Sequence, residues 1–161
     1  MGQIVSHGDL KGRESVFDVL RKKHNLSGRI LSVGRLDINS QGLLLITNSG
    51  EIARRLELPA NGFERIYRLR VFGPIDEKKL AALKNGITIA GVHYGSIIVK
   101  REKSEGQNSW LTVHLHQGKN REIRKVMQHL GLSVNKLIRI SYGPYELGKL
   151  APEGLKEVKP C

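Results

Sequence analysis

Hydrophobic and polar residues alternate along this chain with two periods, one typical of β-strands and the other of α-helices. Residues 64–72 alternate, with Tyr67, Leu69 and Val71 on one face and Arg68 and Arg70 on the other, which predicts a strand. Residues 120–131 place apolar side chains at positions i, i+3, i+4 and i+7, which predicts an amphipathic helix. The same patterns predict strands at 29–33, 42–47, 110–116, 134–142 and 145–147, two strands joined around Gly91 within 87–100, and helices at 15–25, 48–59 and 76–86.

Residues that can cap a helix stand at the start of each predicted helix. They are Ser15, Asn48, Asp76 and Asn120. Asn48 and Glu51 also have the spacing of a capping box, and residues 102–109 predict a charged hairpin connection. Because strands and helices mix without regular β-α alternation, the pattern predicts an α+β fold with a mixed, mostly antiparallel sheet flanked by helices. We expect residues 1–161 to form one domain with a loop-like start at 1–14.

The charge of the chain favours an anionic polymer as its partner. The sequence has 27 Lys and Arg against 15 Asp and Glu, a net charge of +12 with a pI of about 10.1. One acid, Glu122, accompanies six basic residues between positions 119 and 139, namely Lys119, Arg121, Arg124, Lys125, Lys136 and Arg139. Such a cluster could be a solvated face, but in a chain this basic it favours phosphate contacts. Since only 5% of the residues are aromatic, we expect these contacts to be mainly electrostatic.

The cellular setting is predicted by features that the sequence lacks. The single cysteine, Cys161, has no partner in the chain and therefore predicts no disulfide framework. The first ten residues do not have the pattern of a signal peptide, and no apolar run approaches the length of a membrane span. We therefore expect a cytoplasmic protein with no membrane contact, and we expect it to be a monomer.

Candidate chemistry centres on Asp37, in a polar loop that leads into the predicted strand 42–47, with Arg35 two residues before it. This carboxylate could cap a turn or act in catalysis. Tyr67 is predicted on the core side of its strand, where its hydroxyl needs a buried partner.

His114 and His116 share a face of a predicted strand, but no cysteine or acidic cluster accompanies them, so a solvent-facing pair is favoured over a metal site.

Several classes of enzyme site are absent from the sequence. It contains neither a phosphate-binding P-loop nor the glycine fingerprint of dinucleotide-binding folds, and it has no serine nucleophile elbow. Asp37 has no acidic neighbour in its motif, whereas most glycoside hydrolases use two carboxylates. Chemistry that depends on a single carboxylate therefore fits better, and we find no site for a cofactor or a metal in the sequence.

Four sequence blocks follow one another along the chain. The first is Gly34-Arg35-Leu36-Asp37 followed by Gly42-Leu43-Leu44-Leu45 and Thr47-Asn48, and the second is Ile66-Tyr67-Arg68. The third runs from Gly118 to Lys125, and the fourth from Leu137 through Tyr142-Gly143-Pro144 to Leu147. Together they span about residues 29–150 and resemble the signature of ribosomal RNA pseudouridine synthases, and Arg13 with Val16-Phe17-Asp18 resembles the block that precedes them in that family. Asp-Ile-Asn and Asn-Arg-Glu-Ile-Arg most resemble the enzymes that modify the large ribosomal subunit, including its 23S RNA.

The resemblance implies a role for each matching residue. It makes Asp37 the catalytic carboxylate, which attacks the target uridine at the ribose C1′ or acts through a glycal, after which the base is rejoined through carbon. Arg35 would help to displace the target nucleotide from its stack, Tyr67 would lie against the flipped base, and Arg124 would pair with Asp37. Leu137 would complete the active site. The residues expected to bind RNA are Lys119, Arg121, Lys125, Lys136 and Arg139.

Two departures from the family pattern accompany this resemblance. Family members usually begin with a small RNA-binding domain and a strand with a Lys-Pro pair, and this chain starts after both. We therefore expect an N-terminally truncated catalytic domain. Ser40-Gln41 replaces a Thr followed by Glu or Ser, a change that we expect to be tolerated.

Two other function classes stay open alongside an RNA-modifying isomerase. A non-catalytic protein could keep this fold and bind ribosomal RNA or an assembling large subunit through its basic surface alone. A glycosidase for small substrates is a more distant alternative, which activity independent of salt and of polymer length would favour.

Overall fold

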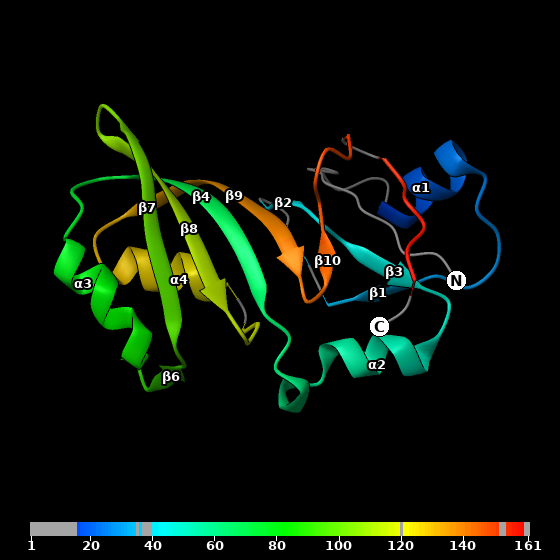
Figure 1. Cartoon of the computed structure of the whole chain (residues 1–161), viewed down its shortest axis with the longest axis horizontal. Helices are drawn as coiled ribbons and strands as arrows, with labels where there is room; N and C mark the ends of the chain where they lie inside the picture. Colours follow the sequence, from blue (N-terminus) through cyan, green and yellow to red (C-terminus); the bar gives the residue numbers. More distant parts are fainter. Residues whose placement is uncertain (1–15, 35, 37–39, 120, 152–153, 160–161) are drawn as a thin grey trace.

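The chain forms an α+β structure, as the sequence predicted. The computed structural model describes residues 16–34, 36, 40–119, 121–151 and 154–159. The helices are α1 (Val16–His24), α2 (Gly50–Glu57), α3 (Glu77–Ala82) and α4 (Glu122–His129), with 3₁₀ turns at Pro59–Asn61 and Leu83–Asn85. The strands are β1 (Leu31–Val33), β2 (Gln41–Gly42), β3 (Leu45–Thr47), β4 (Arg65–Phe72), β5 (Ile87–Ile89), β6 (Val92–Tyr94), β7 (Ile97–Glu105), β8 (Asn108–Leu115), β9 (Ser133–Tyr142) and β10 (Tyr145–Glu146). Figure 1 shows this arrangement.

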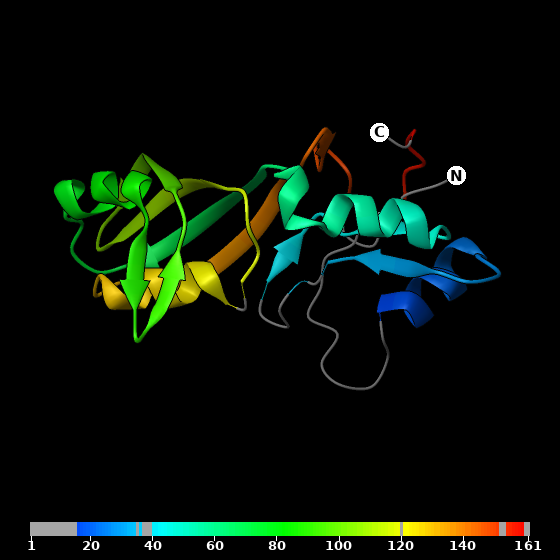
Figure 2. The same cartoon turned by 90° about the horizontal axis from the view of Figure 1, so that it is seen from below.

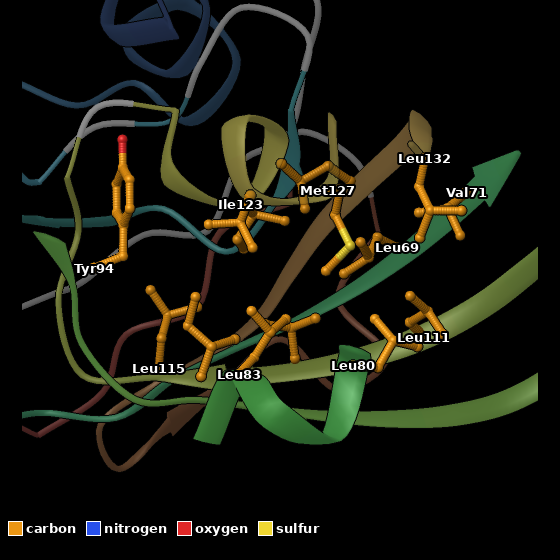
Figure 3. Close-up of a cluster of buried hydrophobic side chains, with 14 residues drawn as sticks. Leu69, Val71, Leu80, Leu83, Tyr94, Leu111, Leu115, Ile123, Met127 and Leu132 are labelled. Atoms are coloured by element: carbon orange, nitrogen blue, oxygen red, sulfur yellow. The ribbon is translucent and has the colours of Figure 1, made fainter. Parts of the chain in front are cut away.

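The larger part of the molecule is built on a sheet with the strand order β10-β9-β4-β8-β7. These neighbours are antiparallel, and the predicted alternation of β4 turns Leu69 and Val71 into the core with no exposed surface. Leu80 of α3 and Met127 of α4 join the same buried cluster, in which both helices converge on the strands (Figure 3). Figure 2 shows α3, α4 and the β5–β6 hairpin on the near side of this sheet, and none of the helices in the described part of the chain covers the opposite face.

A smaller group of elements packs beside this sheet around the antiparallel pair β1–β3 (Figure 1). Leu56 of α2 is buried with Val33 and Leu45, whereas Leu20 of α1 is buried in a separate cluster with Ile46. The two helices therefore cover opposite faces of the pair (Figure 2). No helix among the described residues is long and apolar enough to cross a membrane.

The segment predicted as one strand at 42–47 is two short strands that belong to different sheets. β2 pairs in parallel with β9, whereas β3 pairs with β1 in the smaller group. The chain turns between them at Gly42, which has a φ of +106° and lies against the backbone of Arg139. Side-chain pattern could not separate the strands, because Leu43, Leu44 and Leu45 are all buried although they face different neighbours.

Other element boundaries also differ from the sequence prediction. Ser49, not Asn48, caps α2, because its Oγ accepts a hydrogen bond from the Ile52 amide at 3.3 Å. The predicted connection at 102–109 is mostly strand, since β7 continues to Glu105 and pairs with β8 from Asn108. Arg121 occupies the cap position of α4 with a φ of 52° and no side-chain cap bond. The predicted caps Ser15 and Asn120 lie outside the described residues.

Candidate active site

A cavity of about 960 Å³ lies where the two groups of elements meet. Its first wall comes from β1, the segment after it, and the end of α2. Its second wall comes from β4, β8, α4, β9 and the loop before α4. The lining residues are Ser32, Gly34, Leu36, Ser40, Glu57, Pro59, Arg65, Tyr67, Leu115, Gln117, Gly118, Lys119, Arg121, Glu122, Ile123, Arg124, Leu137, Arg139 and Tyr142.

Tyr67 and Leu137 line this cavity from the neighbouring strands β4 and β9 of the larger sheet. Tyr67 is half-buried and packs against the main core, which confirms its predicted place on the core side of β4. Leu137 pairs with Leu69 in the register of β4 and β9 and is also buried. The two residues therefore offer an apolar surface beside the polar part of the cavity.

The predicted basic cluster divides between the cavity and the outer surface. Lys119, Arg121, Arg124 and Arg139 line the cavity, and their four positive charges give it a strongly cationic wall. Lys125 and Lys136 are exposed and are not among its lining residues. Residues close together in the sequence therefore lie on different surfaces of the fold, because neighbouring positions point in different directions on the helix α4 and to opposite sides on the strand β9.

Two arginines of the site, the half-buried Arg124 and the buried Arg139, are held by backbone carbonyls. Nη1 of Arg124 donates a hydrogen bond to the Val134 carbonyl at 3.2 Å. Nε of Arg139 donates to the Leu43 carbonyl at 2.9 Å, and this side chain is only 2% exposed. Arg139, expected from the sequence to bind RNA, therefore lies beneath the cavity surface, where it joins β9 to the chain that follows β2.

Arg65 and Tyr142 belong to this site although sequence reasoning did not select them. Nη2 of Arg65 donates to the Tyr142 hydroxyl at 2.9 Å, and its guanidinium lies 4.7 Å from the centre of that ring. The Tyr142 hydroxyl in turn donates to the Leu56 carbonyl at 2.9 Å, which ties β9 to α2. A signal was present, since Arg65 shares the core-side alternation of Tyr67 and is an unusual residue there.

Asp37 and Arg35, the predicted catalytic carboxylate and its companion, lie outside the described residues. Their neighbours Gly34, Leu36 and Ser40 all line the cavity. The Gly34 amide donates a hydrogen bond to Oε1 of Glu57 at 2.7 Å, and Ser40 is buried. The described parts of this segment therefore border the same space as Tyr67 and Arg124.

Comparison with known proteins decides the family. Residues 1–129 match the family model described as RNA pseudouridylate synthase. The chain belongs to this family. It is 44% identical over 160 residues to a protein of Rickettsia felis named as an uncharacterized RNA pseudouridine synthase, a match that covers 98% of this chain and 67% of that protein. The predicted membership in this class of isomerases is thus confirmed.

Further relatives agree with the pseudouridine synthase assignment. Ribosomal large subunit pseudouridine synthase B of Salmonella typhi is 41% identical over 153 residues, which are 95% of this chain and 52% of that protein. A crystal structure of a pseudouridylate synthase superposes with a TM-score of 0.80 at 22% identity, covering 99% of this chain and 71% of the other, and so confirms the fold. The chain spans about two thirds of the Rickettsia relative and about half of the Salmonella enzyme.

Glu122 is a buried carboxylate in the wall of this synthase cavity, and it was not predicted to be part of the site. Its oxygens accept hydrogen bonds from the Lys119 amide and from Nε2 of Gln117, each at 3.4 Å. Burial raises the pKa of Glu122, and the bonds from Lys119 and Gln117 and the charges of Lys119 and Arg65 oppose this effect only in part. The residue fastens the loop before α4, from which Lys119 and Arg121 reach the cavity.

Replacement of Glu122 by Gln is expected to make stability less dependent on pH. The folded protein holds the Glu122 proton more tightly than the unfolded chain, because the pKa of this carboxyl is raised in the fold. Its contribution to stability is therefore full below the unfolded pKa and is lost as pH rises through the folded pKa. Melting temperatures from pH 4 upwards should fall more steeply for wild type than for Glu122→Gln. Parallel curves for the two proteins would contradict this assignment.

The histidine pair of the sequence lies beside a single carboxylate. Nδ1 of His114 is 3.5 Å and Nε2 of His116 is 3.8 Å from the oxygens of Glu64. His116 is exposed and His114 half-buried. No group of three His, Cys, Asp or Glu with the geometry to hold a metal occurs within the described ranges.

Proposed function

We propose that this chain is the catalytic domain of an RNA pseudouridine synthase that isomerises one uridine in the 23S RNA of the large ribosomal subunit. The observation that carries the proposal is the shared cavity, which Tyr67 and Arg124 line together with the described residues on either side of Asp37. The relatives include a ribosomal large subunit synthase, which supports the choice of RNA. In this proposal residues 1–161 act as one domain, as a monomer and without a cofactor.

In the proposed reaction Asp37 carries out the step that detaches the base. Asp37 attacks the target nucleotide at the ribose C1′, or acts through a glycal, and the bond from N1 of the base to the ribose breaks. The uracil turns and its C5 bonds to C1′, which breaks the bond from C1′ to Asp37 where one has formed and frees the carboxylate. C5 then loses its proton while N1 gains one. Because the product is an isomer of the substrate, no oxidant, reductant or second substrate is consumed.

The remaining residues prepare the nucleotide and the carboxylate. Arg35 helps to extrude the target base, a step that costs a few kcal/mol in folded RNA. Tyr67 and Leu137 lie against the extruded base, and the positive charge of Arg124 keeps Asp37 ionised. Lys119 and Arg121, exposed at the cavity rim, contact the flanking phosphates.

A map of pseudouridine in large-subunit RNA incubated with the chain tests this function. We expect conversion of one uridine in 23S RNA, with no cofactor added. Salt-sensitive RNA binding without conversion would replace the proposal by the non-catalytic binding protein. Activity on small uridine compounds that does not depend on salt or on polymer length would instead favour a small-substrate enzyme, since phosphate contacts make RNA binding strongly salt-dependent.

A further inference from the structure

The face of the larger sheet turned away from α3 and α4 carries two rows of basic side chains that the cavity does not use. In the first row, Lys136 of β9 pairs with Arg70 of β4, which pairs with Trp110 of β8, and Trp110 pairs with Lys103 of β7. In the next row Arg68 and Lys100 both pair with Thr112. We call this surface the outer sheet face and define it by its tryptophan and its charged residues, which are Trp110, Arg68, Arg70, Lys100, Lys103, Lys136 and the two acids Glu102 and Glu105.

Two of the five cations on the outer sheet face form no ion pair with its acids. Glu102 forms an ion pair with Arg68 at 2.9 Å. Glu105 lies 3.9 Å from Arg70 and 3.5 Å from Lys103 and so serves both. Lys100 and Lys136 are exposed, and neither forms an ion pair with another residue in the described part of the chain. The outer sheet face thus keeps an excess of three positive charges.

The outer sheet face also offers a flat surface on which a base can stack. The guanidinium of Arg68 lies 4.3 Å from the centre of the Trp110 ring, and the Arg68 side chain remains 37% exposed. Its ion pair with Glu102 and its contact with Trp110 hold the guanidinium plane in place. Unpaired RNA bases stack on arginine planes and aromatic rings of this kind.

The dimensions of the outer sheet face fit a stretch of sugar-phosphate backbone. A row across β9, β4, β8 and β7 spans three strand spacings of about 4.8 Å each, or roughly 14 Å. Each strand of a duplex carries one phosphate per about 3.4 Å of helix axis, so more than one phosphate can lie across such a row. An ordinary solvated sheet face needs no excess of one sign, whereas a polyanion is attracted by it.

We propose that the outer sheet face binds the backbone of the same RNA, at a distance from the target nucleotide. The identification of the occupant as RNA rests on the proposed function and on the net charge of +12. The cavity uses Tyr67 and Leu137 on one side of β4 and β9, whereas Arg70 and Lys136 point from the other side of the same strands. An RNA must therefore pass around the sheet to contact both the cavity and the outer sheet face. Only a long RNA gains affinity from the second surface.

The double substitution Lys100→Gln with Lys136→Gln tests this surface. Its binding to polyuridylate and to a short oligouridylate is measured as a function of salt concentration. For polyuridylate we expect affinity to fall about tenfold or more at moderate salt, and the slope of log affinity against log salt to shrink by about one per lysine. For the short oligouridylate we expect no change, because it fills the cavity without reaching the outer sheet face.

The control is Lys78→Gln with Lys79→Gln, which removes the same charge from exposed positions on α3. An equal effect of the control, an unchanged slope in the Lys100 and Lys136 variant, or no binding of polyuridylate by wild type would overturn the inference. So would loss of a dimer in that variant with RNA binding intact, which would assign the face to a second copy. Failure of wild type to form pseudouridine, with the expected slopes observed, would overturn the proposed function alone.

Discussion

Replacement of Asp37 by Asn is expected to lower the rate of pseudouridine formation on the order of 10⁴-fold without weakening RNA binding. The amide has nearly the same shape as the carboxylate but cannot act as the nucleophile. The cationic residues of the cavity, among them Arg124, Lys119 and Arg121, are untouched by the change. The measurement is the single-turnover rate on large-subunit RNA, together with the dissociation constant from the same preparation.

Glu51→Gln is the matched control for Asp37→Asn. Glu51 is an exposed carboxylate on α2 that is not among the residues lining the cavity, so its loss changes the net charge equally. We expect the control to keep the wild-type rate within about twofold, as surface substitutions usually have small effects. If Asp37→Asn modified RNA at the wild-type rate, the proposed chemistry of Asp37 would be wrong even though the family membership would stand.

Replacement of Gly42 by Ala is expected to destabilise the fold by about 2–5 kcal/mol, since a positive φ costs about 1–2 kcal/mol for alanine and overpacking a further 1–3. A Cβ at this position would lie 2.2 Å from the Arg139 carbonyl oxygen and 2.8 Å from its amide nitrogen. Both are backbone atoms, so β2 must separate from β9. Urea denaturation followed by circular dichroism measures the loss, and activity should fall with it because β2 follows the segment of Asp37.

Gly28→Ala separates the two causes of this loss. Gly28 has a φ of +82°, but a Cβ there would meet nothing within 4 Å. The control should therefore lose only the backbone contribution, about 1–2 kcal/mol. Equal losses of unfolding free energy for the two variants would show that the close approach of β2 to β9 contributes nothing to the destabilisation by Gly42→Ala.

Local sequence patterns were sufficient to predict the elements that bury one face against a single core. The alternation of β4 placed Tyr67 correctly, and the helical period of α4 placed Ile123, Val126 and Met127 in the core. Both predictions depend only on the spacing of apolar residues within a short window of sequence, since that spacing decides which face of the element is buried. Family membership was equally accessible, because its motifs are short and continuous.

Contacts between distant segments could not be predicted in this way. The Arg139 bond to the Leu43 carbonyl joins residues 96 positions apart, and the contact of Arg65 with Tyr142 spans 77. Glu122 looked like the one acid in a basic run, but its burial against Lys119 and Gln117 makes it part of the cavity wall. Such roles depend on which surfaces meet after folding.

The sequence by itself determined the period of each element, the excess of positive charge and the family to which the motifs belong. Those are properties of neighbouring residues or of the whole composition. Only the tertiary structure decided that 42–47 divides between two sheets, that the basic cluster faces two directions, and that Arg139 lies buried while Lys136 stays exposed. The physical reason is that burial and strand pairing depend on partners far along the chain. The strand β9 is the example, because it pairs with β2 and β4 and contributes residues both to the cavity and to the outer sheet face.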